Sequence, residues 1–169
     1  MIKPLILTIF FILLNSAICR ADEIDDLIPA IIQIESGGNP RAVSPKGAIG
    51  ILQITPIVLE EYNQVEKRII KGPLFDPQVN IEYGQWYLRR LKDHYLKDKY
   101  TIERMLAAYN GGITRLRDVN YDVSKMSSET KNYVKKVMQI YLSVQEHAKQ
   151  YQSKSKDGVM EKVEPGYGR

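Results

Sequence analysis

The sequence predicts a mainly α fold, a single helical domain, and three observations support that prediction. Apolar residues recur three or four positions apart in several long stretches, which is the spacing of one helix face. No stretch of any length alternates apolar and polar residues as a half-buried strand does, so we expect at most a small β-hairpin near residues 44–55. The length of 169 residues suits one compact domain.

The first residues are typical of a secretory signal peptide. Lys3 precedes an apolar run that is too short for comfortable membrane spanning, and cleavage after Ala21 leaves small residues where a signal peptidase reads them. We therefore expect residues 1–21 to be a signal peptide, and the protein to be exported to the periplasm or the cell envelope. The alternatives are an uncleaved membrane anchor and a lipid anchor on Cys19, the only cysteine in the chain.

Glu35 stands where the first predicted helix would place an apolar residue. The apolar stripe of that helix consists of Ile24, Leu27, Ile28 and Ile31. Glu35 continues the stripe towards the core, and a carboxylate buried without a cationic partner keeps its proton near neutral pH, as a general acid does. Residues 36–40 (SGGNP) then end the helix, which places Glu35 at the edge of the loop that follows. The alternative is a surface carboxylate on a slightly misphased helix.

Caps and spacing indicate the other helices before residue 100. The acidic residues up to Asp26 are expected to precede the first helix, which would put Pro29 in its first turn. Residues 57–62 indicate a short helix. A longer helix starts at Asn80, and Gly84 inside it suggests the close approach of another helix, the alternative being a tolerated glycine.

Two further helices are indicated after residue 100. Thr101 caps the first of them, which the pair Gly111 and Gly112 stops. Ser127 or Ser128 caps the last helix. Its apolar periodicity ends at Tyr151, so we expect residues 22–151 to form the domain and residues 152–169 to be a disordered tail.

Four motifs follow one another in the chain. They are residues 35–56 (ESGGNPRAVSPKGAIGILQITP), 76–91 (DPQVNIEYGQWYLRRL), 107–112 (AAYNGG) and 129–137 (ETKNYVKKV). In this order they resemble the motifs of lytic transglycosylases of the soluble-lytic-transglycosylase (SLT) type, relatives of goose-type lysozyme. The resemblance covers roughly Asp25 to Tyr141 and implies an α+β, lysozyme-like fold with a sugar-binding cleft.

The resemblance also implies a reaction on peptidoglycan. Most glycosidases use two carboxylates, but lytic transglycosylases need no activated water. Glu35 would protonate the oxygen between N-acetylmuramic acid and N-acetylglucosamine, and would then take the proton of the muramic acid C6 hydroxyl as that oxygen closes on C1. The product would be a 1,6-anhydro sugar.

Supporting residues follow from the same motifs. By resemblance, Ser44 lies near the carboxylate or the acetamido group, Gln53 binds sugar, Tyr109 and Asn110 face the cleft, and Tyr133 orients Glu35. Taken singly, each has a structural alternative as a turn former, a surface amide or a core aromatic residue. Glu129 is interpreted as a charge that complements the N-terminus of the last helix.

Several other functions and partners are disfavoured or left open. His94 and His147 lack acidic or cysteine neighbours at ligand spacing, so no metal and no cofactor is expected. The net charge is +4, but the basic residues form no stripe with interleaved aromatic residues, so no nucleic-acid partner is expected. We expect a monomer that acts on glycan strands, with a secretion, conjugation or phage apparatus as a hypothetical partner. The alternatives are a hydrolytic muramidase of the same fold and a noncatalytic wall-binding component.

Overall fold

Helices make up most of the part of the chain that the structure describes. The computed structural model describes residues 22–67, 70 and 72–156. The α-helices are α2 (Glu23–Glu35), α3 (Pro56–Glu66), α4 (Pro77–Arg90), α5 (Ile102–Gly111), α6 (Ile113–Asp118) and α7 (Ser128–Lys156). The π-helix η1 (Leu91–Leu96) and the 3₁₀ helices η2 (Lys97–Lys99) and η3 (Val123–Lys125) connect them. The mainly α prediction is confirmed.

Side-chain caps set where the helices begin. Thr55 caps α3 through Val58 N–H (3.4 Å), and Thr101 caps α5 through Arg104 N–H (3.2 Å), the latter as predicted. Asp22 caps α2 through Ile24 N–H (3.3 Å), so α2 begins earlier than expected. The expectation for Pro29 was wrong for this reason, because the early start places that residue inside the helix and not in its first turn.

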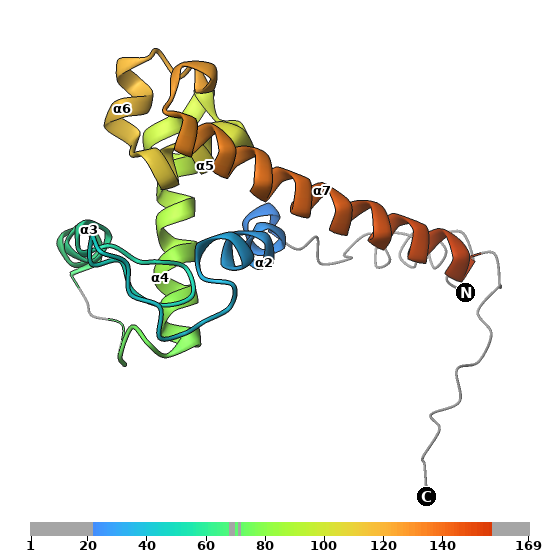
Figure 1. Ribbon diagram of the computed structural model, residues 1–169, viewed down its shortest axis with the longest axis horizontal. Helices are drawn as coiled ribbons and strands as arrows, with labels where there is room; N and C mark the ends of the chain where they lie inside the picture. The colour runs from blue at the N-terminus through green and yellow to red at the C-terminus, as the bar shows by residue number, and fades with distance from the viewer. Residues whose placement is uncertain (1–21, 68–69, 71, 157–169) are drawn as a thin grey trace, which may run out of the picture.

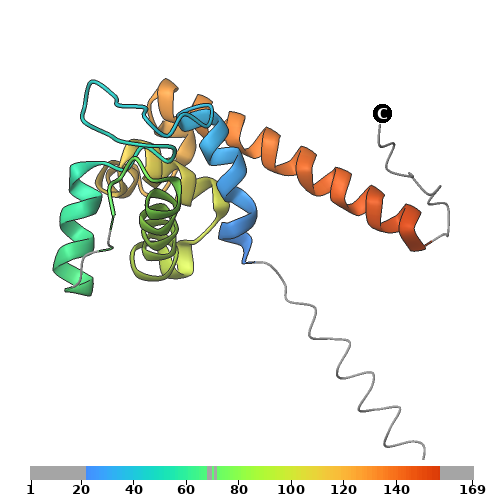
Figure 2. The ribbon, with the colours of Figure 1, turned by 90° about the horizontal axis from the view of Figure 1, so that it is seen from below.

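The core lies where α2, α4, α5 and the first half of α7 meet. Helix α2 packs against α4 and α7, and α5 packs against α6 and α7. The last turns of α7 extend beyond the other described helices in both views (Figures 1 and 2). This helix continues to Lys156, past the boundary predicted at Tyr151. The predicted signal peptide, residues 1–21, and residues 157–169 of the predicted tail lie outside the described residues.

A long loop connects α2 to α3 and lies along one edge of the helices (Figure 2). Two isolated antiparallel bridges, between Val43 and Ile49 and between Ile49 and Ile54, take the place of the small hairpin allowed by the sequence. In the part of the chain that the structure describes, these bridges are the β structure present.

Gly84 of α4 faces this loop. A Cβ atom at this position would overlap Leu52 Cδ1, so the backbone is closely approached here, but by the loop and not by the helix that the sequence suggested. Among residues 22–67, 70 and 72–156, no helix combines the length and the hydropathy needed to cross a lipid bilayer.

Candidate active site

Glu35 is the last residue of α2, and the chain leaves the helix directly after it. Gly37 and Gly38 follow with φ angles of 61° and 84°, which favour glycine. The Ser36 hydroxyl donates a hydrogen bond to the Ile51 carbonyl (2.9 Å) and ties the end of α2 to the long loop. The helix therefore holds Glu35 against the loop that follows it.

The surroundings of Glu35 favour its protonated form. The side chain is half-buried, and burial raises the pKa of Glu35 to about 7. The Tyr133 hydroxyl acts in the opposite direction and lowers this pKa in part. That hydroxyl is buried and completes no hydrogen bond with a described residue, so the two groups are close neighbours and not a bonded pair. A carboxyl with this pKa is about half protonated at pH 7, which lets it both give and accept a proton.

Ser44 shapes the loop and keeps its hydroxyl proton free as a hydrogen-bond donor. Its hydroxyl oxygen accepts hydrogen bonds from the backbone N–H groups of Lys46 (3.3 Å) and Ala48 (3.0 Å). The turn-forming alternative for Ser44 therefore holds. Because the oxygen serves as the acceptor in both bonds, the hydroxyl proton remains available to donate to a ligand.

Gln53 is bonded in a similar way. Its side-chain amide nitrogen donates to the carbonyls of Gly50 (2.9 Å) and Ala42 (3.3 Å). Its backbone has a φ of 49°, a left-handed conformation that is uncommon outside glycine. The amide oxygen accepts from no described residue, so it can accept from a sugar hydroxyl.

A buried asparagine fixes the centre of the loop. Asn80 is fully buried in α4, and its Oδ1 accepts from Leu52 N–H (2.8 Å). Its Nδ2 donates to the carbonyls of Ile49 and Leu74, both at 2.9 Å. From α5, the Tyr109 hydroxyl donates to the Leu52 carbonyl (2.7 Å). The backbone at Leu52 is therefore held by α4 and by α5, which fixes the loop relative to Glu35.

Asn110 follows Tyr109 on α5 and is oriented by the start of α7. Its Oδ1 accepts from the hydroxyl of Thr130 (3.0 Å), a residue that is itself buried. This bond leaves the Asn110 amide nitrogen as a donor for a ligand. Burial raises the pKa of Tyr109 well above its ordinary value, so the Tyr109 hydroxyl stays neutral.

Five of the six predicted site residues line one cavity of about 330 Å³, which we call the Glu35 cavity. Its lining residues are Glu35, Ser44, Pro45, Lys46, Ala48, Gln53, Thr55, Tyr109, Asn110 and Glu129. Tyr133 does not line it; this tyrosine is buried next to Glu35.

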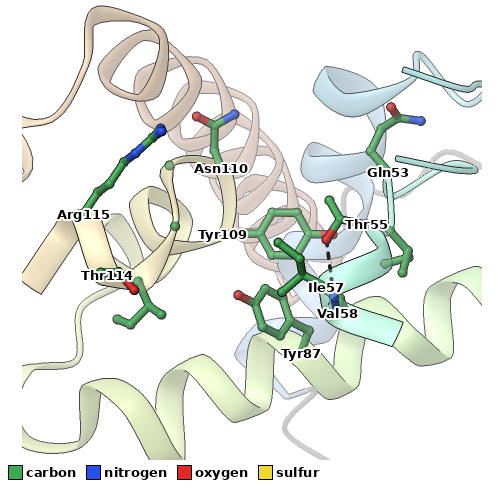
Figure 3. Close-up of a pocket in the computed structure, with 13 residues that line it drawn as sticks. Gln53, Thr55, Ile57, Val58, Tyr87, Tyr109, Asn110, Thr114 and Arg115 are labelled. Atoms are coloured by element: carbon green, nitrogen blue, oxygen red, sulfur yellow. Dashed lines mark hydrogen bonds between the residues drawn. The ribbon is translucent and has the colours of Figure 1, made fainter. Parts of the chain in front are cut away.

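A second cavity of about 370 Å³, the Arg115 cavity, adjoins the first, because Gln53, Thr55, Tyr109 and Asn110 line both. Figure 3 shows Thr114 and Arg115 of α6 on one side of it and Gln53 and Thr55 on the other, with Tyr109 and Tyr87 between them. The two cavities together form a groove with Glu35 at one end.

Sequence reasoning missed parts of this site. Lys46 and Glu129 line the Glu35 cavity. Glu129 lies in the first turn of α7, where its charge was expected to complement the helix, but nothing in the sequence shows that this turn faces Glu35. Sequence reasoning also missed the role of Asn80 in holding the loop, although its place in the motif of residues 76–91 was a signal for it. In the described ranges, no group of three or more His, Cys, Asp or Glu side chains is arranged to hold a metal ion.

The fold and the groove define a helical domain that presents a half-buried acid to an elongated cavity. Residues 13–134 match the family described as Transglycosylase SLT domain, and the chain belongs to this family. The chain is also similar to two solved structures. It matches the 70-kDa soluble lytic transglycosylase from Escherichia coli with 30% identity and a TM-score of 0.52, over 66% of this chain and 20% of that one. It matches the complex of the 70-kDa soluble lytic transglycosylase with bulgecin A with 31% identity and a TM-score of 0.54, over the same shares.

Curated relatives give the same family. Membrane-bound lytic murein transglycosylase C of Actinobacillus pleuropneumoniae is 32% identical, and the match covers 66% of this chain and 39% of the relative. A transglycosylase of Enterobacteria phage PRD1 is 30% identical over 112 residues, which cover 66% of this chain and 35% of the relative. The match therefore spans well under half the length of these relatives.

Proposed function

We propose that this protein is a peptidoglycan lytic transglycosylase with Glu35 as its acid and base. One observation carries the proposal: a half-buried carboxyl with a pKa of about 7 opens into a groove that neutral hydrogen-bonding side chains line on several sides. The relatives named lytic murein transglycosylase support peptidoglycan as the substrate.

The first step is acid catalysis. The protonated Glu35 gives its proton to the glycosidic oxygen between N-acetylmuramic acid and N-acetylglucosamine, and the bond from that oxygen to muramic acid C1 breaks. Positive charge develops on the muramic acid ring, and the carbonyl oxygen of the substrate's own acetamido group stabilises it. Glu35 becomes a carboxylate, which the adjacent Tyr133 hydroxyl can stabilise by turning its proton towards it.

The second step uses the same carboxylate as the base. Glu35 takes the proton of the muramic acid C6 hydroxyl while the C6 oxygen bonds to C1. This bond closes the 1,6-anhydro ring and returns Glu35 to its protonated form, without consuming water. The pKa of about 7 suits both steps, because the proton is neither too weakly nor too tightly held.

The other groove residues are proposed to hold the sugars. The Ser44 hydroxyl and the Asn110 amide nitrogen are free donors among them, and the Gln53 amide oxygen is a free acceptor. Each of these side chains is already fixed by a hydrogen bond within the protein. Little side-chain freedom is therefore lost when substrate binds.

Glu129 supports a second candidate function, a hydrolytic muramidase. Its exposed carboxylate lines the same cavity as Glu35, so it is a residue that could position a water for attack on C1. The two functions differ in the mass of their products by one water.

Mass spectrometry of soluble products from purified peptidoglycan tests both functions. The protein should release 1,6-anhydro products, and Glu35→Gln should release none. Glu60→Gln is the matched control, because Glu60 is exposed and lies outside the groove. Full-mass reducing products that disappear in Glu129→Gln would instead identify a muramidase. The absence of products from every variant would refute both and favour a wall-binding component.

The cellular setting is also proposed. We infer an exported monomer that acts in the periplasm or cell envelope and opens the wall locally for a secretion, conjugation or phage apparatus. The names of the membrane-bound relatives and of the phage transglycosylase support this setting. An even distribution in the envelope, together with a requirement in ordinary wall growth, would argue against a dedicated apparatus.

A further inference from the structure

Arg115 stands at the end of the groove away from Glu35 and has no partner within the described chain. It lines the Arg115 cavity and a third cavity of about 250 Å³, the Lys125 cavity, so one side chain serves both. The side chains of three of the described arginines, Arg89, Arg90 and Arg104, donate to protein oxygens at 2.7–3.1 Å, whereas those of Arg41, Arg115 and Arg117 do not. No described oxygen accepts from Arg115, and its side chain is exposed to solvent.

The charges of the groove differ between its two ends. Arg115 carries the charge of the Arg115 cavity, since the other residues that line it are neutral. The Lys125 cavity holds Arg115, Lys125 and Asp118, which leaves it net positive. The ammonium of Lys125 is 3.4 Å from Asp122, in an exposed pair that an incoming anion can exchange at little cost. In the Glu35 cavity the charges of Glu129 and Lys46 oppose each other, and Glu35 is neutral in its acid form, so an anion is favoured more at Arg115 than there.

The proposed substrate supplies an anion of matching chemistry. The sugar rings of a glycan strand are neutral, and its carboxylates lie on the lactyl substituent of muramic acid or on the stem peptide attached to it. A guanidinium binds a carboxylate through two parallel N–H donors, which an ammonium cannot do.

We propose that Arg115, with Lys125 beside it, forms a carboxylate-binding subsite for the lactyl-peptide substituent of peptidoglycan. This inference rests on the proposed function. The subsite would make the groove select glycan strands by their substituents as well as by their sugars.

Binding to three ligands tests the proposal in the Glu35→Gln variant, which prevents turnover. The ligands are glycan strands with stem peptides, strands stripped by an amidase that leaves the lactyl carboxylate, and chito-oligosaccharides that carry no carboxylate. Adding Arg115→Gln should weaken binding of a carboxylate-bearing ligand about 5-fold, the upper range for a solvent-exposed ion pair, and should leave chito-oligosaccharide binding unchanged. The strand that responds identifies the source of the carboxylate.

Arg117→Gln is the matched control. It removes the same charge from the same helix, but Arg117 lies over the Tyr95 ring, 5.2 Å from its centroid, and lines none of the three cavities. In turnover assays with Glu35 intact, Arg115→Gln should raise KM about 5-fold with little change in kcat. Equal weakening of all three ligands, or of none, would overturn the subsite. If the unmodified protein released no anhydro products but the ligand discrimination persisted, the proposed function would fail while the subsite remained.

Discussion

Replacing Glu35 by Gln should stabilise the protein at high pH and not at low pH. A folded-state pKa of about 7, above the ordinary value of 4.5, means that the folded chain binds more protons than the unfolded chain between these two pH values. Stability therefore falls as pH rises through this window and levels off above it. The Gln variant lacks this loss.

The size of the effect follows from the two pKa values. The difference between 4.5 and about 7, at about 1.36 kcal/mol for each pH unit, gives about 3 kcal/mol. Solvent in the Glu35 cavity screens the carboxylate, so this figure is an upper value. The free energy of unfolding of Glu35→Gln should exceed that of the parent protein by up to about 3 kcal/mol at pH 8, and the difference should vanish near pH 4.

Urea unfolding of both proteins at a series of pH values measures this difference. Subtracting one curve from the other removes the contributions of all groups that the two proteins share. Glu60→Gln should show no comparable pH dependence, because its side chain is exposed. A difference between Glu35→Gln and the parent that stays constant from pH 4 to pH 8 would show that burial does not perturb Glu35, and the assignment of a shared acid and base would lose its physical basis.

Three further substitutions test the packing around the site. Tyr133→Phe removes the hydroxyl that lowers the pKa of Glu35, so the fall in activity above neutral pH should move to higher pH. The free energy of unfolding should not change, because that hydroxyl makes no hydrogen bond with a described residue. An unmoved pH profile would contradict this. Asn80→Leu leaves three backbone groups unpaired and should cost about 3 kcal/mol in urea unfolding, and a cost below about 1 kcal/mol would mean that the loop holds itself. Gly84→Ala forces a methyl group into Leu52, so it should lower the free energy of unfolding by about 1–3 kcal/mol and lower kcat. An unchanged unfolding midpoint would contradict this and would show that α4 can shift.

Local signals in the sequence were enough to place Glu35. Its position depends on the 3.6-residue period of α2 and on the glycines that end this helix, and both can be read within about 15 residues. The cap at Thr101 and the close approach at Gly84 are local in the same sense. By contrast, no helical period could locate the π-helical turn at Leu91–Leu96.

The resemblance supplied what the local signals could not. Tertiary structure brings Ser44, Gln53 and Asn110 to the same cavity, and only the family motifs indicated that they meet. The motifs did not show which hydrogen-bond donors and acceptors of these side chains are used within the protein and which are free. The motifs also did not predict that Glu129 lines the cavity, because its position depends on how α7 docks against the rest of the domain.

The hydrogen bonds of Asn80 also bear on when the groove forms during folding. They join positions 28 and 31 residues apart in the sequence, so the loop has no reason to adopt its final shape until α4 has docked beside it. Once formed, the loop can open only by breaking bonds to a fully buried side chain. The Leu52 amide should therefore exchange its hydrogen with solvent as slowly as the amides of the central helices. The groove then belongs to the same cooperative unit as the core, and a molecule with a folded core also has an assembled site.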